Sequence, residues 1–261
     1  MTSIDLGVLK EISNLTKKVK QELLRKFKET SWMQVDNEFG FNILEQFEIT
    51  LNEIKVRTEF DKYDKDMTTL RNINRNMNSR YWEHIKRETG CRWFDVWHAF
   101  STTSLQLNEM DTTSEEEEIY FRLANSLQNN AWNYGESNII LILAPTFYPH
   151  LHNASNTTMF AFAGHILGHE MYHSFITEAL LNRSEDFKAE AECLFNHYTE
   201  SCRLFAEGEC VSGTQTFYED GADLEGVRAA YSLLKRKYTS KQLKQYEYPD
   251  LKITREQSFF Y

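Results

Sequence analysis

The pattern His-Glu-x-x-His at residues 169–173 constrains the fold more than any other stretch of the sequence. On a helix, positions i and i+4 lie nearly above one another, so His169 and His173 can direct their imidazole nitrogens at one metal ion. Zinc is the ion that this pattern favours, and Glu170 would lie close to a water on the metal without being a ligand itself. The motif therefore predicts the site of a metal hydrolase, unless the pattern arose by chance on a structural helix.

The motif lies within a helix that we predict from about Thr157 to Leu181. Before the motif this helix is apolar on nearly all sides, so it should pass through the interior. The preceding segment, Asn138–Ala144, is short, apolar and partly β-branched, which predicts a strand. Its free edge could hold an extended peptide beside the metal by backbone hydrogen bonds. The alternative for Asn138–Ala144 is an ordinary core strand.

A hydrolytic zinc site needs three protein ligands and one open position for water, so a third ligand should follow His173. The last histidine is His197, and the best carboxylate candidate is Glu219, four residues before Asp223. Glu219 would complete the ligand set, while Asp223 would accept the spare N–H of a ligand histidine and fix its tautomer. The alternative is a helix with a solvated acidic face. Other carboxylates follow the motif more closely: Glu178, Glu185, Asp186, Glu190 and Glu192.

A further histidine, His165, precedes His169 by four residues and could share its face of the helix. One straight helix cannot arrange three histidines tetrahedrally around a single ion. We therefore expect His165 to be a hydrogen-bonded interior residue or part of a pocket wall.

The rest of the chain is predicted to be mainly helical. Only 3 prolines and 10 glycines interrupt the 261 residues, so the chain has few places to turn. Two segments near the start have apolar residues every three or four positions, the pattern of amphipathic helices, and a third helical segment is expected from about Met67 to Phe100. The two sets are Ile12, Leu15, Val19, Leu23 and Phe27, then Phe39, Ile43, Phe47, Leu51 and Ile54. With the predicted strand, the fold class is mainly α, of the α+β kind.

The net charge of the chain limits the classes of partner that it is expected to bind. Acidic residues outnumber basic ones 39 to 29, and the formal charge of -10 argues against binding to nucleic acid or to anionic lipid. The apolar stretches are too short to cross a bilayer, and the first residues lack the apolar core of a signal peptide, so we expect a soluble chain. Four N-x-[ST] sequons would nevertheless suit an extracellular protein; they begin at Asn14, Asn153, Asn156 and Asn182.

Several spaced motifs together resemble a known family. Glu219-x-x-x-Asp223, followed by a glycine-containing segment and Arg-Ala-Ala-Tyr at 228–231, resembles the second zinc motif of the neprilysin family of gluzincin metallopeptidases. Also similar are the dipeptide Asn130-Ala131, the run Leu143–Tyr148 and the run from Gly164 to His173. The resemblance is close over residues 128–235 and loose over the whole chain.

This resemblance implies a zincin-like catalytic region that binds one Zn2+ per chain and hydrolyses oligopeptides. By position, the implied zinc ligands are His169, His173 and Glu219, the general base is Glu170, and the carboxylate that supports the zinc site is Asp223. The residues implied to bind substrate are Asn130 and Ala131, which would hold its backbone, with Phe147 and Ile166 lining the pocket for the side chain after the cut.

The resemblance also implies an organisation and a location. Residues 1–110 would form a helical region packed on the catalytic part, and residues 111–261 would form the zinc-binding metallopeptidase region, truncated at its C-terminal end. Members of the family are extracellular or lie at the cell surface, so the same location is expected here, although this sequence shows no signal peptide or membrane anchor. The sequence does not predict an oligomeric state.

Departures from the family pattern weaken the expectation of catalysis. The sequence ends before the family's histidine that stabilises the oxyanion and its arginine that grips the substrate. The Asp-rich segment that usually follows the second zinc histidine is replaced by Ser-Phe-Ile-Thr-Glu at residues 174–178. Losing one donor to an oxyanion typically costs about a hundredfold to a thousandfold in rate. We therefore expect a weak zinc metalloendopeptidase, and the alternative is an inactive relative that binds zinc or peptides or pairs with another chain.

Overall fold

The computed structural model describes residues 6–30, 43–58, 130–135, 138–143, 146, 154–176, 185–201 and 212–260. The chain forms two compact units. One comprises residues 1–3, 57–130 and 142–145, and most of it lies outside the described ranges. The other comprises residues 4–56, 131–141 and 146–261 and contains the helices considered below. The predicted boundary at residue 110 and the helix predicted from Met67 to Phe100 also lie outside the described residues.

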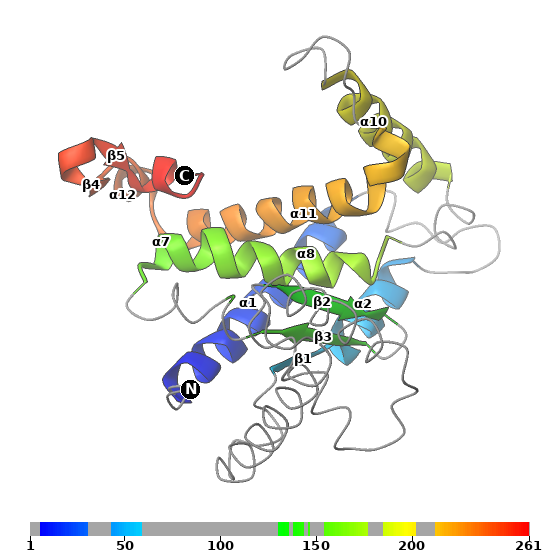
Figure 1. The fold of residues 1–261 in the computed structure, drawn as a ribbon, viewed down its shortest axis with the longest axis horizontal. Helices are drawn as coiled ribbons and strands as arrows, with labels where there is room; N and C mark the ends of the chain where they lie inside the picture. The colour runs from blue at the N-terminus through cyan, green and yellow to red at the C-terminus, as the bar shows by residue number, and fades with distance from the viewer. Residues whose placement is uncertain are drawn as a thin grey trace, which may run out of the picture. The chain divides into compact units, whose positions relative to one another are not determined.

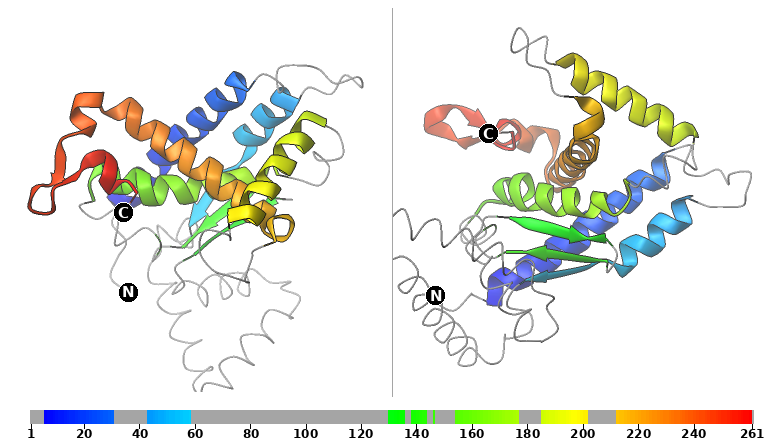
Figure 2. Two further views of the ribbon diagram at one scale, coloured as in Figure 1. Left: turned by 90° about the horizontal axis from the view of Figure 1, so that it is seen from above. Right: turned by 45° about the vertical axis from the view of Figure 1, so that its right-hand side comes forward.

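The described part of the chain is mainly helical with small sheets, as predicted (Figures 1 and 2). Within these ranges, no helix combines the length and apolar character that crossing a bilayer requires. In chain order, the elements are α1 (Leu6–Glu29), α2 (Ile43–Glu53), β1 (Lys55–Thr58), β2 (Ala131–Tyr134), β3 (Ile139–Ile142), α7 (Asn156–Met159), the π-helical turn η3 (Phe160–Gly164), α8 (His165–His173), α10 (Glu185–Ser201), α11 (Gly213–Lys237), α12 (Ser240–Leu243), β4 (Tyr246–Tyr248), the 3-10 turn η5 (Pro249–Leu251), β5 (Ile253–Thr254) and α13 (Arg255–Ser258).

The two amphipathic segments near the start form α1 and α2. All five apolar residues predicted for the first helix are buried, and so are Ile43, Phe47 and Leu51 of the second. The rings of Phe27 and Phe47 meet edge to face with centroids 5.1 Å apart, which joins the two helices. The predicted start of the second helix at Phe39 lies outside the described residues, and Ile54 follows its end.

The predicted strand forms as β3, but it does not have the free edge that we expected. The three-stranded sheet has the order β1-β3-β2, so β3 is central and its Ile140, Leu141 and Ile142 are buried. Among the described strands, the outer positions belong to β1 and β2. The alternative of a core strand therefore describes β3, and the edge nearer the motif is β2, which packs against α8.

The helix with the His-Glu-x-x-His motif begins near its predicted start but ends early. Ser155 caps α7 by accepting the N–H of Thr158 on its Oγ at 3.2 Å, and the chain continues through η3 into α8. The predicted end at Leu181 is wrong, because α8 ends at His173. The N–H of Phe175 donates to the carbonyl of Tyr172, three residues back, at 2.8 Å, which closes the last turn.

Packing of Phe175 accounts for this early end. Its side chain is 2% exposed, and its ring centroid lies 5.0 Å from that of Phe27 and 4.6 Å from that of Phe47. The turn at residues 174–175 thus places a buried ring against α1 and α2, and this tertiary packing stabilises the turn over the local helical pattern.

The close crossing of α8 and α11 depends on two glycines, and Figures 1 and 2 show these helices side by side. A Cβ atom on Gly168 would lie 2.9 Å from the Cα of Gly226. A Cβ on Gly226 would lie 2.9 Å from both the backbone nitrogen of His169 and the carbonyl oxygen of His165. These neighbours are backbone atoms that cannot rotate away. Only glycine at both positions allows this approach.

A buried carboxylate joins α1 to α11. Glu22 is 1% exposed and accepts hydrogen bonds from Arg25 on its own helix and from Ser232 and Arg236 on α11. Burial alone would raise the pKa of Glu22, but the hydrogen bonds from these three residues and the charge of Arg25 outweigh it and lower the pKa. The ionised form of Glu22 therefore stabilises the packing of these helices.

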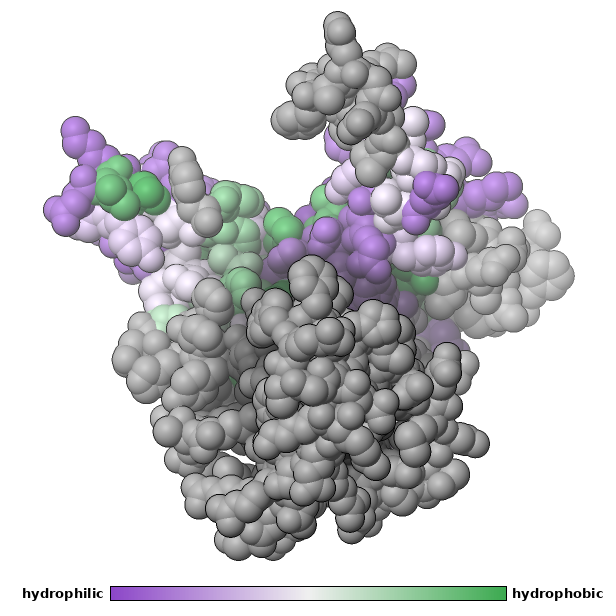
Figure 3. Space-filling view, in the orientation of Figure 1, coloured by the Kyte–Doolittle hydropathy of each residue, from purple (hydrophilic) through white to green (hydrophobic). Residues whose placement is uncertain are grey.

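The described surface over α10 and the C-terminal segment is predominantly hydrophilic (Figure 3). Large apolar side chains are exposed there at a few positions, among them Leu251 at 69% and Phe260 at 63%.

The Gly226→Ala substitution should destabilise the protein, because its methyl group would overlap backbone atoms of α8. We expect a loss of roughly 1–3 kcal/mol in the free energy of unfolding, measured by chemical denaturation. Gly164→Ala is the matched control, since its Cβ would meet nothing closer than Ala230 Cβ at 3.6 Å. Equal stabilities for the two variants would contradict the importance of the close crossing.

Glu22→Gln should lower the free energy of unfolding at neutral pH by about 1.5–3 kcal/mol, the usual range for hydrogen bonds to a charged group. Because the folded pKa lies below the ordinary value of 4.5, this stabilisation is complete above pH 4.5 and is lost as the pH falls through the folded pKa. The difference between wild type and variant should therefore shrink on acidification. The control is Glu48→Gln, because Glu48 forms an exposed ion pair with Lys28, with 3.5 Å between Oε2 and Nζ. This substitution should change the free energy of unfolding little.

Candidate metal centre

Two helices supply the four side chains predicted to build the metal site. His169 and His173 lie on consecutive turns of α8, and Glu219 and Asp223 on consecutive turns of α11. The Nε2 atoms of the two histidines are 3.0 Å apart. Oε2 of Glu219 lies 3.3 Å from Nε2 of His169 and 3.6 Å from Nε2 of His173. The structure therefore brings the three predicted zinc ligands together.

These distances suit a zinc ion. Zinc–nitrogen and zinc–oxygen bonds of about 2.0–2.1 Å in a tetrahedron place neighbouring ligand atoms roughly 3.3–3.4 Å apart. The three separations of 3.0, 3.3 and 3.6 Å lie around that value. Two imidazoles and one carboxylate are also a known donor set of hydrolytic zinc sites, in which the fourth position takes water. The side chain of Glu219 is 68% exposed, so water can reach this position.

Asp223 orients His169. Its Oδ1 lies 2.8 Å from Nδ1 of the histidine. When Nδ1–H donates to this carboxylate, the lone pair of the imidazole is on Nε2, the atom that faces His173 and Glu219. Asp223 thus selects the tautomer that a metal needs.

The second histidine is favoured in its neutral form. Burial lowers the pKa of His173, and the neighbouring His169 lowers it further, against the opposing effects of Glu219 and Asp223. A neutral imidazole is the form that binds a metal ion, so less proton release is needed when the ion binds.

Glu170 has the properties of a general base. The residue is 8% exposed. Burial raises the pKa of Glu170 to about 7, with a smaller lowering effect from His169 and a raising effect from Glu219. A carboxyl group that titrates near neutral pH can both accept and release a proton.

Asn133 on β2 was not predicted from the sequence, and it ties this strand to the end of α8. Its Nδ2 donates to the carbonyl oxygen of Glu170 and, at 2.8 Å, to Oγ of Ser174. The N–H of Ser174 donates to Met171 rather than to Glu170, which leaves the Glu170 carbonyl for Asn133. The only signal in the sequence was an asparagine two residues after Ala131, on the same face of the strand.

The residues predicted to bind substrate are placed in different surroundings. Ala131 opens β2 and is buried, and Asn130 just before it is exposed. Ile166 is half-buried on α8. Phe147 lies outside the described residues. The roles of these four residues in substrate binding stay predictions.

His165 lies beside the centre rather than in its main ligand set. Its Nε2 is 3.4 Å from Oδ1 of Asp223, and this nitrogen is buried without a hydrogen bond to the described residues. His165, His169 and Asp223 form a second group of ligand atoms within 4.8 Å of one another. The contact with Asp223 is an ion pair at 3.4 Å rather than a well-formed hydrogen bond, and the expected role of His165 in the interior or in a pocket wall stays a prediction.

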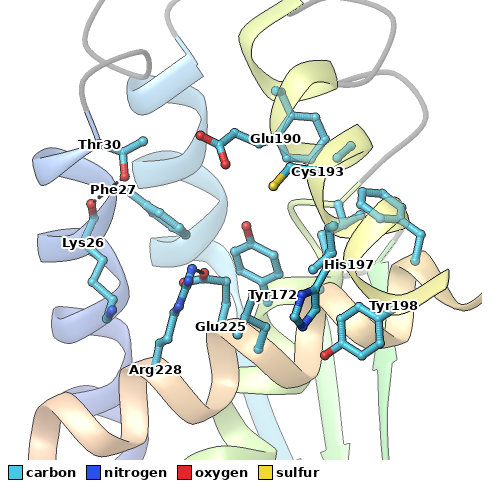
Figure 4. Close-up of a pocket in the computed structure, with 17 residues that line it drawn as sticks. Lys26, Phe27, Thr30, Tyr172, Glu190, Cys193, His197, Tyr198, Glu225 and Arg228 are labelled. Atoms are coloured by element: carbon cyan, nitrogen blue, oxygen red, sulfur yellow. Dashed lines mark hydrogen bonds and ion pairs between the residues drawn. The ribbon is translucent and has the colours of Figure 1, made fainter. Parts of the chain in front are cut away.

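A cavity of about 490 Å³ lies on the other side of α11, between α1, α8 and α10 (Figure 4). Its described lining mixes aromatic and apolar residues with Lys26, Glu190, Glu225 and Arg228, and it includes none of the four metal-centre residues. Burial raises the pKa of Tyr172 in its wall, and Glu225 and Glu190 raise it further, so the hydroxyl stays protonated. This cavity is separate from the candidate centre.

Comparisons with known proteins agree with this geometry. The sequence matches peptidase family M13 over residues 130–261, just over half of the chain, including every metal-centre residue. The chain is also similar in fold to the crystal structure of PepO from Lactobacillus rhamnosis HN001, with a TM-score of 0.56 and 16% identity. The match covers 89% of this chain and 36% of that one, so this chain spans about a third of the length of PepO. A search of curated proteins found no match.

The chain therefore belongs to peptidase family M13, the neprilysin family of metallopeptidases. The predicted resemblance to this family is confirmed. The family uses zinc and acts on peptides, and the described residues offer a candidate His/Glu/Asp metal site.

Replacing Asn133 by leucine should destabilise the end of α8, because it removes both donors and leaves the Glu170 carbonyl unpaired. We expect a loss of about 1–3 kcal/mol in the free energy of unfolding and faster hydrogen exchange of amides 171–175. Ser174→Ala, which removes one partner, should cost less. Asn196→Leu, at an exposed position on α10, is the control. An Asn133→Leu protein as stable as this control would show that the two bonds contribute nothing.

Proposed function

We propose that this protein is a zinc-dependent metalloendopeptidase that hydrolyses peptide bonds of oligopeptides. The observation that carries the proposal is the cluster of His169, His173 and Glu219, whose ligand atoms lie within 3.6 Å of one another next to a buried carboxylate, Glu170. Membership of the M13 family supports the same proposal.

The three ligands would hold Zn2+, which supplies a Lewis acid and a water whose pKa is lowered to about 7. Asp223 keeps Nδ1 of His169 protonated and its Nε2 free for the metal. Glu170, whose pKa burial raises to about 7, would take a proton from water and release it to the leaving amine.

The substrate backbone would lie along β2, an outer strand of the sheet that packs against α8. β2 is outer among the strands that the structure describes, and an outer strand is where an extended peptide can add by backbone hydrogen bonds. Asn130 and Ala131 are the proposed contacts at its start, with Phe147 and Ile166 at the side-chain pocket. The hydrogen bonds of Asn133 keep this strand in register with the turn that carries Glu170. We extend the proposal to an extracellular or cell-surface location, in keeping with the family resemblance.

Glu170→Gln should slow peptide hydrolysis severely while zinc binding is retained, because the variant keeps the ligands but loses the proton acceptor. General acid–base catalysis typically contributes about 10²–10⁴-fold, so the rate should fall by that factor. The measurement is cleavage of a mixed oligopeptide library, with the zinc content of the same samples. Glu219→Gln should instead lower zinc content.

Glu225→Gln is the matched control, because Glu225 lies on α11, as Glu219 does, but pairs with Arg228 on the side facing the cavity. It should leave both zinc content and hydrolysis unchanged. Hydrolysis that survives Glu170→Gln would exclude the assigned base. Zinc uptake without any cleavage by the wild-type chain would favour the alternative of an inactive, zinc-binding relative.

A further inference from the structure

His165 has a ring nitrogen that the fold leaves without a partner. It opens α8, one turn before His169, and its Nε2 is buried without a hydrogen bond to the described residues. Gly226 approaches the ring closely, since a Cβ there would lie 2.9 Å from Cδ2 of His165. The ring is therefore held in place by packing rather than by a hydrogen bond. A buried polar atom without a partner requires an explanation, and a bound ion is one such explanation.

Oδ1 of Asp223 lies 3.4 Å from this nitrogen. That separation equals the roughly 3.3–3.4 Å expected between two ligand atoms of one tetrahedral zinc ion. An ionised carboxylate offers about four lone-pair positions, so Asp223 can bind a cation and still accept the N–H of His169. Its side chain is 58% exposed, which lets water complete the coordination.

His165 does not join the three ligands of the main centre. Its ring centroid lies 6.2 Å from that of His169, whereas the rings of His169 and His173 are 4.6 Å apart. Its Nε2 lies close to the same Asp223 oxygen that Nδ1 of His169 contacts, whereas the main centre is on the Nε2 side of His169. The two groups of ligand atoms therefore define two positions that share His169 between them.

We propose that His165 and Asp223 form a second divalent-cation site next to the zinc centre, and that filling it slows peptide hydrolysis. One imidazole and one carboxylate suit Zn2+, and also Cu2+ or Ni2+. With only two firm protein ligands and another cation close by, this site binds more weakly than the centre. A cation on Asp223 withdraws negative charge from the group that orients His169 and so weakens the hold on the catalytic ion. The slowing of hydrolysis rests on the function proposed above, whereas the binding site does not.

The test measures zinc bound per chain in the full-length protein at a series of buffered free Zn2+ concentrations. We expect wild type to bind one zinc at low free concentration and a second at higher concentration. His165→Phe keeps a ring of similar shape, and it should keep the first zinc and weaken the second by roughly tenfold or more. His197→Phe, at an exposed histidine on α10, should bind as wild type does. A second variant, His165→Leu, guards against a folding defect of the first, with thermal unfolding measured for both.

Two results would overturn the site: no second zinc bound by wild type up to the solubility limit of Zn2+, or a second zinc bound equally well by the His165 variants.

Hydrolysis by wild type should fall over the range of free Zn2+ in which the second zinc binds, and hydrolysis by His165→Phe should not. An equal fall in both would overturn the inhibitory effect. Glu219→Gln separates the two proposals. This variant should weaken binding of the first zinc and should not change binding of the zinc that depends on His165. The binding curves therefore differ between a failure of the main centre and a failure of the second site.

Discussion

The candidate centre depends on how closely α8 and α11 approach each other. Each helix alone can present a pair of side chains one turn apart, but neither can surround an ion. Gly168 and Gly226 let the two backbones meet at a distance that a single methyl group would prevent. Glu219 and Asp223 then reach the histidines of α8 at 2.8–3.6 Å. The arrangement of the candidate ligands is thus a product of backbone packing between the two helices.

Local sequence patterns predicted the parts of this arrangement that are themselves local. The spacing of His169 and His173 on one helix, and of Glu219 and Asp223 on another, follows from 3.6 residues per turn, and the structure has both. Apolar periodicity likewise predicted α1 and α2. The pairing of the two helices was predicted from the third ligand that a hydrolytic zinc site needs, with Glu219 chosen among several carboxylates, and the family resemblance then pointed to the same residue.

What could not be predicted was decided by long-range contacts. The length of α8 was overestimated, since the sequence continues in a helical pattern and only the contacts of Phe175 with α1 and α2 show why the chain turns. The free edge was assigned to β3 because its sequence predicts a strand, whereas β2 has only four residues, Ala-Trp-Asn-Tyr, and was not recognised as one. Asn133 was overlooked for the same reason. Its partners lie 37 and 41 residues away along the chain.

Because the centre is divided between two helices, binding of a metal ion is coupled to the folding of the unit that holds them. An ion that binds only the assembled pair stabilises it by about 2.7 kcal/mol at a free concentration one hundred times its dissociation constant. Glu22 adds α1 to the same assembly through Ser232 and Arg236 of α11. A chelator would therefore lower the thermal stability of the three helices together, and the zinc supply of the surroundings would help to set how long the folded chain persists.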